Sequence, residues 1–293
     1  MKKLLILSGK GGTGKTTTAG ALAEFSHAKA LADCDVDAPN LHLIGHAVGE
    51  CTEKPFCGGE IAEIDQEKCV CCGLCAQHCR FDAIRFTPEG VQVRPEACEG
   101  CGVCEYVCPR EAVSLHPDVS GTQRLYRGEG VFSTAKLRMG RGNSGKLVTA
   151  VKKDLLKNAP DTELAIIDGS PGIGCPVIAS VSGVDLVLVV AEPSVSGLSD
   201  LKRLMKTAQT FEVPLAVCVN KWDQSPEKTA EIEAFCRENR LPFVGKIPYD
   251  ATASRAVNAG RSLASADCPA SRALRYLYES VCALLELPAA QNQ

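Results

Sequence analysis

The chain has 293 residues, of which 45% are hydrophobic and 5% aromatic, and its formal net charge is −3. That charge and the scarcity of aromatic side chains exclude a protein that binds nucleic acid through a basic surface or by base stacking. No apolar stretch has the length of a membrane span, and the opening run at 4–7 is too short for a secretion signal. We therefore expect a protein of the reducing cytoplasm with no membrane partner.

Short apolar runs alternate with helical patterns along most of the chain. Strands are expected at 4–7, 28–32, 164–168, 185–191, 214–220 and 243–248, and helices at 16–25, 146–157, 197–210, 226–239 and 270–286. Apolar runs without polar alternation are typical of strands that are buried on both faces. The pattern predicts an α/β fold with a mainly parallel sheet and helices on both faces.

A change of composition to Cys, Glu and Arg interrupts this pattern between about residues 57 and 117. We expect a main domain in two parts, at 1–57 and 118–293, and an inserted domain at 58–117, because domains with adjacent termini can be inserted into others.

The first motif, GKGGTGKT at 9–16, lies between the first predicted strand and the first predicted helix. It satisfies G-x-x-x-x-G-K-S/T, the phosphate-binding P-loop. Its backbone N–H groups converge on phosphate oxygens, Lys15 binds the β- and γ-phosphates, and the Thr16 hydroxyl coordinates Mg²⁺. The predicted nucleotide-binding residues are Gly9, Lys10, Gly11, Gly12, Thr13, Gly14, Lys15, Thr16 and Thr17.

With its additional lysine, Lys10, the loop resembles the deviant Walker A motif of the MinD/ParA superfamily, which includes the nitrogenase iron protein and the Mrp-type iron–sulfur carriers. The resemblance implies that Lys10 reaches the phosphates of the partner subunit in an ATP-bound homodimer. A cation supplied in this way stabilises transition-state charge as an arginine finger does, so hydrolysis would depend on dimerisation.

Two further segments match the superfamily. In DCDVDAPN, after the second predicted strand, the resemblance implies that Asp35 orients the attacking water, while Asp33 and Asp37 help to order Mg²⁺ and this switch loop. The segment AIIDGSPGIG resembles the superfamily's Walker B motif and second switch segment, which implies that Asp168 holds Mg²⁺ through water. The implied catalytic residues are Lys10, Lys15, Asp35 and Asp168.

Two cysteine runs form an internal repeat within the expected insertion. EKCVCCGLCAQHCRFDAI and EACEGCGVCEYVCPREAV align with an offset of 29 residues, as from Cys69 to Cys98. Each contains C-x2-C-x2-C-x3-C, the spacing of bacterial ferredoxins, in which the fourth cysteine binds the other cluster. We expect two [4Fe–4S] clusters, one bound by Cys69, Cys72, Cys75 and Cys108, and the other by Cys98, Cys101, Cys104 and Cys79. Zinc bound by pairs of thiolates is the alternative.

The segment CVNKWD at 218–223 is expected to recognise the base of the nucleotide. By resemblance to the superfamily, Asn220 pairs with the edge of adenine, and Pro248 of IPYD lies beside the base. The same N-K-x-D pattern resembles the guanine-reading motif of GTPases, in which Asp223 would accept from guanine. We favour ATP because the rest of the chain resembles ATPases, and GTP stays the alternative.

Three functions are compatible with this sequence. The first is an ATPase whose dimer switching controls electron transfer, or iron–sulfur or metal-cofactor assembly, on a protein partner. The second is a MinD-like positioning ATPase with structural or sensing clusters, but the polar face of the last predicted helix is not basic, and that helix has the pattern of one packed on the core. The third is a passive electron carrier that binds nucleotide. Cys175 matches one cluster ligand of the nitrogenase iron protein, but the second is missing, so no bridging cluster is expected.

Overall fold

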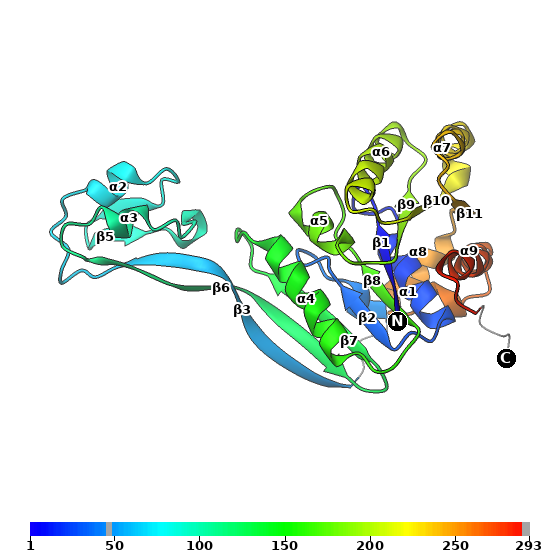
Figure 1. Ribbon diagram of the computed structural model, residues 1–293, viewed down its shortest axis with the longest axis horizontal. Coiled ribbons are helices and arrows are strands. Elements are labelled where there is room, and N and C mark those ends of the chain that lie inside the picture. The colour runs from blue at the N-terminus through cyan, green and yellow to red at the C-terminus, as the bar shows by residue number, and fades with distance from the viewer. Residues whose placement is uncertain (45–48, 289–293) are drawn as a thin grey trace.

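The computed structural model describes residues 1–44 and 49–288. In that part of the chain, nine strands form one sheet in the order β11-β10-β9-β1-β8-β2-β7-β6-β3 (Figure 1). The strands from β11 to β7 run parallel to their neighbours, whereas β6 is antiparallel to both β7 and β3. The prediction of an α/β fold with a mainly parallel sheet is confirmed.

The strands of this sheet are β1 (Lys2–Leu7), β2 (Ala30–Asp33), β3 (Glu50–Ile64), β6 (Val113–Arg127), β7 (Val131–Leu137), β8 (Leu164–Asp168), β9 (Leu186–Ala191), β10 (Leu215–Asn220) and β11 (Phe243–Ile247). The longer helices are α1 (Lys15–Phe25), α4 (Ser144–Asn158), α5 (Cys175–Val181), α6 (Val195–Thr210), α7 (Pro226–Glu238), α8 (Ala251–Asn258) and α9 (Pro269–Leu285). No helix among the described residues is both long and apolar enough to cross a membrane.

Helices cover both faces of the sheet, and each face has its own core. On one face, α4, α5, α6 and α7 pack against alternate side chains of the strands, such as Leu5, Ile167 and Val217. On the other face, α1, α8 and α9 cover the intervening side chains, such as Leu4 and Ile166. This burial on both faces explains why the central strands are continuous apolar runs in the sequence.

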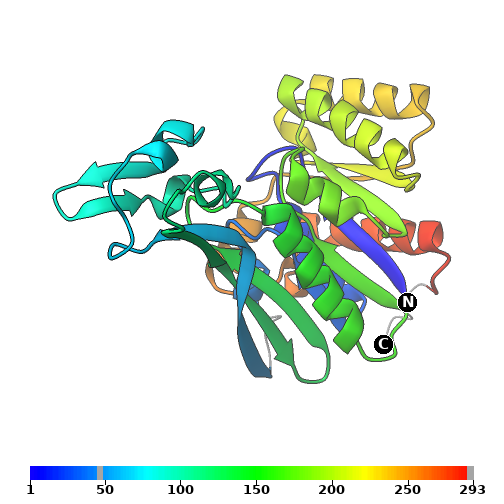
Figure 2. The same cartoon turned by 60° about the vertical axis from the view of Figure 1, so that its left-hand side comes forward.

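Strands β3 and β6 form a long antiparallel ribbon that leaves the sheet. Gly121 of β6 pairs with Leu137, the last residue of β7, so the ribbon beyond this point projects past the carboxyl ends of the parallel strands. Its pairing is irregular between Phe56 and Gly59, which is where it leaves the sheet. Figure 1 shows the ribbon extending away from the main body, and Figure 2 shows α4 beside its base.

The far end of the ribbon carries the cysteine segment, defined here as residues 58–117. It contains the hairpin β4 (Ile84–Thr87) and β5 (Gly90–Val93) and the short helices α2 (Leu74–His78) and α3 (Val103–Tyr106). A small separate cluster of buried apolar side chains joins them: Ala62, Ile64, Ile84, Val91 and Val113. The expected boundaries of the insertion therefore lie inside continuous strands, because the same two strands serve both parts of the molecule.

Candidate functional site

The phosphate loop lies where β1, β8 and β2 end. Asp168 is the last residue of β8 and stands in register with Asp33, the last residue of β2. Gly14 caps α1 with φ of 93°, and a Cβ there would lie 2.2 Å from Nδ2 of Asn220, so both backbone geometry and close packing require glycine. The first turn of α1 thus faces two carboxylates at the carboxyl ends of two central strands.

Asp168 connects the P-loop to the sheet. Its carboxylate is fully buried, forms an ion pair with Lys15 Nζ at 2.6 Å, and accepts a hydrogen bond from the Thr16 hydroxyl at 2.7 Å. Burial acts to lower the pKa of Lys15, but the charge of Asp168 outweighs it and the pKa is raised. The two residues expected to hold phosphate and Mg²⁺ are therefore held beside the expected Walker B carboxylate.

Asp33 organises the loop that carries Asp35. Its carboxylate accepts backbone N–H groups from Asp35 at 3.0 Å and from Asn40 and Leu41 at 2.9 Å each. Burial and the neighbouring charge of Asp168 raise the pKa of Asp33 to about 7. Asp33 is thus a buried support for the expected switch loop, whereas Asp37 is exposed.

A cavity of about 510 Å³ lies in front of the P-loop. Its lining includes Lys10, Lys15, Thr16, Asp35 and Asp37. Burial raises the pKa of Asp35, opposed by the positive charge of Lys15.

The inner surface of this loop fits phosphate oxygens. A Cβ built at Gly11 or Gly12 meets nothing within 4 Å, so the backbone there is open to a ligand. The buried hydroxyl of Thr13 has no hydrogen-bond partner among the described residues. A bound phosphate would offer this hydroxyl an acceptor.

Lys10 contacts its own chain. Its Nζ lies 2.6 Å from Oε2 of Glu192 and donates to the Ser196 hydroxyl at 3.4 Å. Its side chain is 43% exposed. Glu192 follows β9, and its contact with Lys10 could not be predicted from the motif, because the two residues are 182 positions apart in the chain.

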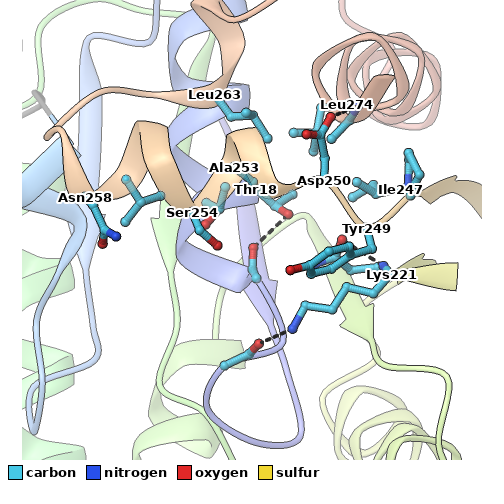
Figure 3. Close-up of a pocket in the computed structure, with 17 residues that line it drawn as sticks. Thr18, Lys221, Ile247, Tyr249, Asp250, Ala253, Ser254, Asn258, Leu263 and Leu274 are labelled. Atoms are coloured by element: carbon cyan, nitrogen blue, oxygen red, sulfur yellow. Dashed lines mark hydrogen bonds between the residues drawn. The ribbon is translucent and has the colours of Figure 1, made fainter. Parts of the chain in front are cut away.

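A second cavity, of about 360 Å³, lies on the other side of the P-loop (Figure 3). It shares Gly12, Gly14 and Thr17 with the first and extends under α8 and α9 to Leu263 and Leu274. Asn220, Lys221, Pro248 and Tyr249 also line it, and Figure 3 shows the Lys221 and Tyr249 side chains at its edge. Together the cavities provide a polar place for phosphates and a partly apolar one for a base.

Asn220 uses part of its hydrogen-bonding capacity within the protein. Its Nδ2 donates to Thr13 O at 2.7 Å, and its Oδ1 accepts the Lys221 N–H at 3.0 Å. Since an amide has two N–H groups and two oxygen lone pairs, one of each is left for a base. Lys221 donates from Nζ to Gly12 O at 3.2 Å, a contact that sequence reasoning missed.

The expected cluster ligands fall into two groups in space. One small cavity is lined by Cys69, Cys72, Cys75 and Cys108, and a second by Cys79, Cys98, Cys101 and Cys104. Each cavity thus brings together cysteines from both runs, such as Cys75 and Cys108, which are 33 positions apart in the chain. Cys71 also lines the first cavity, whereas Cys175 is exposed at the start of α5.

The repeat is visible in equivalent backbone contacts. The Ala83 N–H donates to the Cys79 sulfur at 3.4 Å, and the Ala112 N–H donates to the Cys108 sulfur at 3.2 Å. Ala62 donates similarly to Cys98 at 3.5 Å. Hydrogen bonds from backbone N–H groups to cysteine sulfur tune the reduction potential of a cluster that such sulfurs bind.

No group of three or more His, Cys, Asp or Glu side chains suited to one metal ion occurs in the ranges 1–44 and 49–288. A four-iron cluster instead takes one thiolate at each iron, so its ligands are spread around a larger centre. Two separate sets of four cysteines fit such a centre.

The fold and the paired cavities around the glycine-rich loop define a P-loop nucleotide-binding protein. Residues 4–263 match the CobQ/CobB/MinD/ParA nucleotide-binding domain family, and the chain belongs to this family.

Individual relatives extend this comparison. The chain is 39% identical to the uncharacterized protein MJ0578 of Methanocaldococcus jannaschii, over 75% of this chain and 78% of the relative. It is 24% identical to an iron–sulfur cluster carrier protein of Pyrococcus horikoshii, over 95% and 85% of the two chains. Among solved structures, it resembles the septum site-determining protein MinD of Pyrococcus horikoshii complexed with Mg-ADP, with a TM-score of 0.55, 20% identity and coverage of 96% and 95%.

Proposed function

We propose that this protein is a dimer-dependent ATPase that carries two [4Fe–4S] clusters in an inserted ferredoxin-like domain. Its nucleotide switching controls electron transfer, or iron–sulfur or metal-cofactor assembly, on a protein partner. The observation that carries the proposal is the sorting of eight cysteines into two cavities, each combining three residues of one run with the fourth of the other. The iron–sulfur carrier among the relatives also supports it.

The nucleotide half of the proposal rests on the P-loop cavity. Lys15 and Thr16 would move from Asp168 to the phosphates and Mg²⁺, with Asp168 holding the ion through water and Asp35 orienting the attacking water. Water would attack the γ-phosphorus, the bond from this phosphorus to the β–γ bridging oxygen would break, and ADP, inorganic phosphate and a proton would be released. Lys10 would release Glu192 and reach the partner subunit's phosphates in a homodimer.

ATP is favoured over GTP by the position of Asp223. Its Oδ1 accepts the Tyr249 N–H at 2.8 Å, and Asp223 is not part of the cavity lining. Asn220, which does line the cavity, retains a donor and an acceptor that match the N6/N7 edge of adenine.

The cluster half of the proposal rests on the donor set. Thiolates are the usual ligands of such clusters, and bound clusters would supply one-electron chemistry. The chain's own residues contribute the four-cysteine arrangement, the N–H donors to sulfur, and the apolar side chains around them.

A membrane-positioning role has less support. The apolar face of α9, with Leu274, Leu277, Val281 and Leu285, is buried in the core of the sheet's second face. That face is therefore occupied by the protein itself.

The test is to purify the full chain without oxygen and to measure iron, acid-labile sulfide and ATP hydrolysis. We expect about eight irons per chain. Cys108→Ser should remove the centre that includes Cys69, and Cys79→Ser the centre that includes Cys98. The control, Cys71→Ser, should retain both. Zinc without iron, or loss of the Cys98 centre on Cys108→Ser, would contradict the proposal.

A further inference from the structure

The loop at 138–143, between β7 and α4, contacts both halves of the molecule. At its start, Leu137 donates its N–H to Val36 O at 2.8 Å, directly after Asp35. The next residue, Arg138, donates its N–H to Ser120 O in the ribbon, also at 2.8 Å. The expected switch loop and the base of the ribbon are thus joined through two consecutive backbone groups.

Within this loop, the Arg141 side chain contacts both the ribbon and the cysteine segment. Its Nη2 lies 3.0 Å from Oδ1 of Asp118, and its Nη1 donates to Pro95 O. The Arg141 and Asp118 side chains are only 16% and 15% exposed, so solvent screens this ion pair less than one at the surface. Pro95 begins a short helical turn that ends immediately before Cys98.

The residues that follow the loop reach the other expected switch segment. A Cβ at Gly145 would lie 3.2 Å from Cys175 O, so the first turn of α4 packs on the start of α5. Lys146 donates from Nζ to Gly58 O at 3.1 Å and so also holds the ribbon. Movement of either switch segment would therefore displace the loop at 138–143.

The two cysteine sites differ in their distance from this loop. The Cys98 cavity is lined by Ala62 and Leu115, whereas the Cys69 cavity is lined by Ile64 and Val113. Since a strand rises about 3.3 Å per residue, the Cys69 cavity lies roughly 7 Å farther along the ribbon than the Cys98 cavity. Gly100, with φ of 61°, packs its backbone directly on Glu60 O, where a Cβ would be only 2.2 Å away.

We infer that Arg141 is a positioning residue that couples the Cys79/Cys98/Cys101/Cys104 site to the nucleotide switch segments. Nucleotide binding therefore acts more strongly on this nearer site than on the Cys69/Cys72/Cys75/Cys108 site. The planar guanidinium suits this role because it donates to two separate segments at once. The inference rests on the proposed function for the clusters, but the mechanical link can be measured separately.

The experiment is amide hydrogen exchange on the full-length protein, purified without oxygen, in the presence of Mg²⁺, with and without a non-hydrolysable ATP analogue. In the parent, nucleotide should change exchange in 95–101 by about fivefold or more, and in 66–72 by less. Arg141→Ala should abolish the change in 95–101 while iron content and nucleotide affinity stay parental. Arg141→Lys, which retains the charge but not the planar fork, should restore part of it.

Two matched variants guard against a merely structural effect. Arg124→Ala removes the ion pair with Glu53 at 2.7 Å on the same ribbon, nearer the main body, and should leave the response intact. Asp118→Asn weakens one contact of Arg141 but keeps the Pro95 contact, so it should reduce the response less than Arg141→Ala does.

An unchanged response in Arg141→Ala, or no response at 95–101 in the nucleotide-saturated parent, overturns the inference. Neither outcome affects the iron and hydrolysis measurements that test the proposed function. Conversely, a parent without iron removes the proposed function, while the exchange data still decide whether Arg141 links the two segments.

Discussion

Lys10 is bound to Glu192 within its own chain, and this contact gives a residue-scale prediction. Lys10→Ala should bind ATP with parental affinity but lose dimer-dependent hydrolysis by about a thousandfold, as when an arginine finger is removed. Lys15→Ala should instead weaken ATP binding by about tenfold or more, because a charged contact to phosphate is lost. Titration calorimetry and phosphate release distinguish these effects.

Glu192→Gln is the informative companion. It removes the charge that holds Lys10 in the isolated chain, so we expect dimerisation at a lower ATP concentration. Parental hydrolysis by Lys10→Ala would show that the lysine does not act across a dimer.

Asp33 gives a prediction on pH. Burial raises its pKa from 3.8 to about 7, so between these values only the folded state holds the proton. The free energy of unfolding should therefore fall as the pH rises through this window, by about 1.4 kcal/mol per unit for a fully separated group. Asp33→Asn should flatten this dependence, as measured by urea unfolding at about pH 5 and about pH 8 without nucleotide.

The comparison for this variant is Asp37→Asn, which removes an exposed carboxylate from the same loop. A parental slope in Asp33→Asn would mean that another group carries the pH dependence.

At the scale of elements, the carboxyl end of α5 depends on one lysine. Lys152 of α4 is buried and donates from Nζ to the carbonyl groups of Ala179, Ser180 and Ser182 at 3.0, 2.6 and 2.6 Å. Lys152→Met should destabilise the fold by about 3 kcal/mol, because buried carbonyls lose their donor. Chemical denaturation measures this, and the exposed neighbour Lys153→Met should have little effect.

The central strands could be predicted because each is an apolar run, and the P-loop because its glycines and lysine have fixed spacing. Strand β3 could not be predicted, because most of its residues between Glu50 and Ile64 are exposed and it contains no apolar run. Strand β7 was missed because it buries Ser133 and Thr134 beside its apolar residues. The contacts of Lys10, Asp33 and Arg141 join residues distant in the chain or depend on loop geometry, which spacing does not reveal.

At the scale of the molecule, the ribbon predicts that the two parts are separable. Phe56 is buried in the main core and pairs with Gly121, so replacing 57–120 by Asn-Gly would close a hairpin at the sheet edge. We expect this variant to fold, to bind ATP within about fivefold of the parent, and to contain no iron. Thermal unfolding, calorimetry and metal analysis check the three points.

The same deletion with Lys15→Ala should fold without binding ATP. Failure of the first variant to fold would mean that the main domain needs the cysteine segment for its stability.

The order of strands in the sheet also bears on how the protein is made. β1 and β2 are not neighbours, because β8 lies between them, so the nucleotide-binding sheet cannot close until Asp168 has been synthesised. The contacts within the cysteine segment are complete once β6 has emerged, about 40 residues earlier, and domains generally fold in the order of synthesis. On the ribosome, the outermost part of the molecule can therefore fold before the nucleotide-binding sheet exists, and under the proposed function it could receive iron and sulfide at that stage.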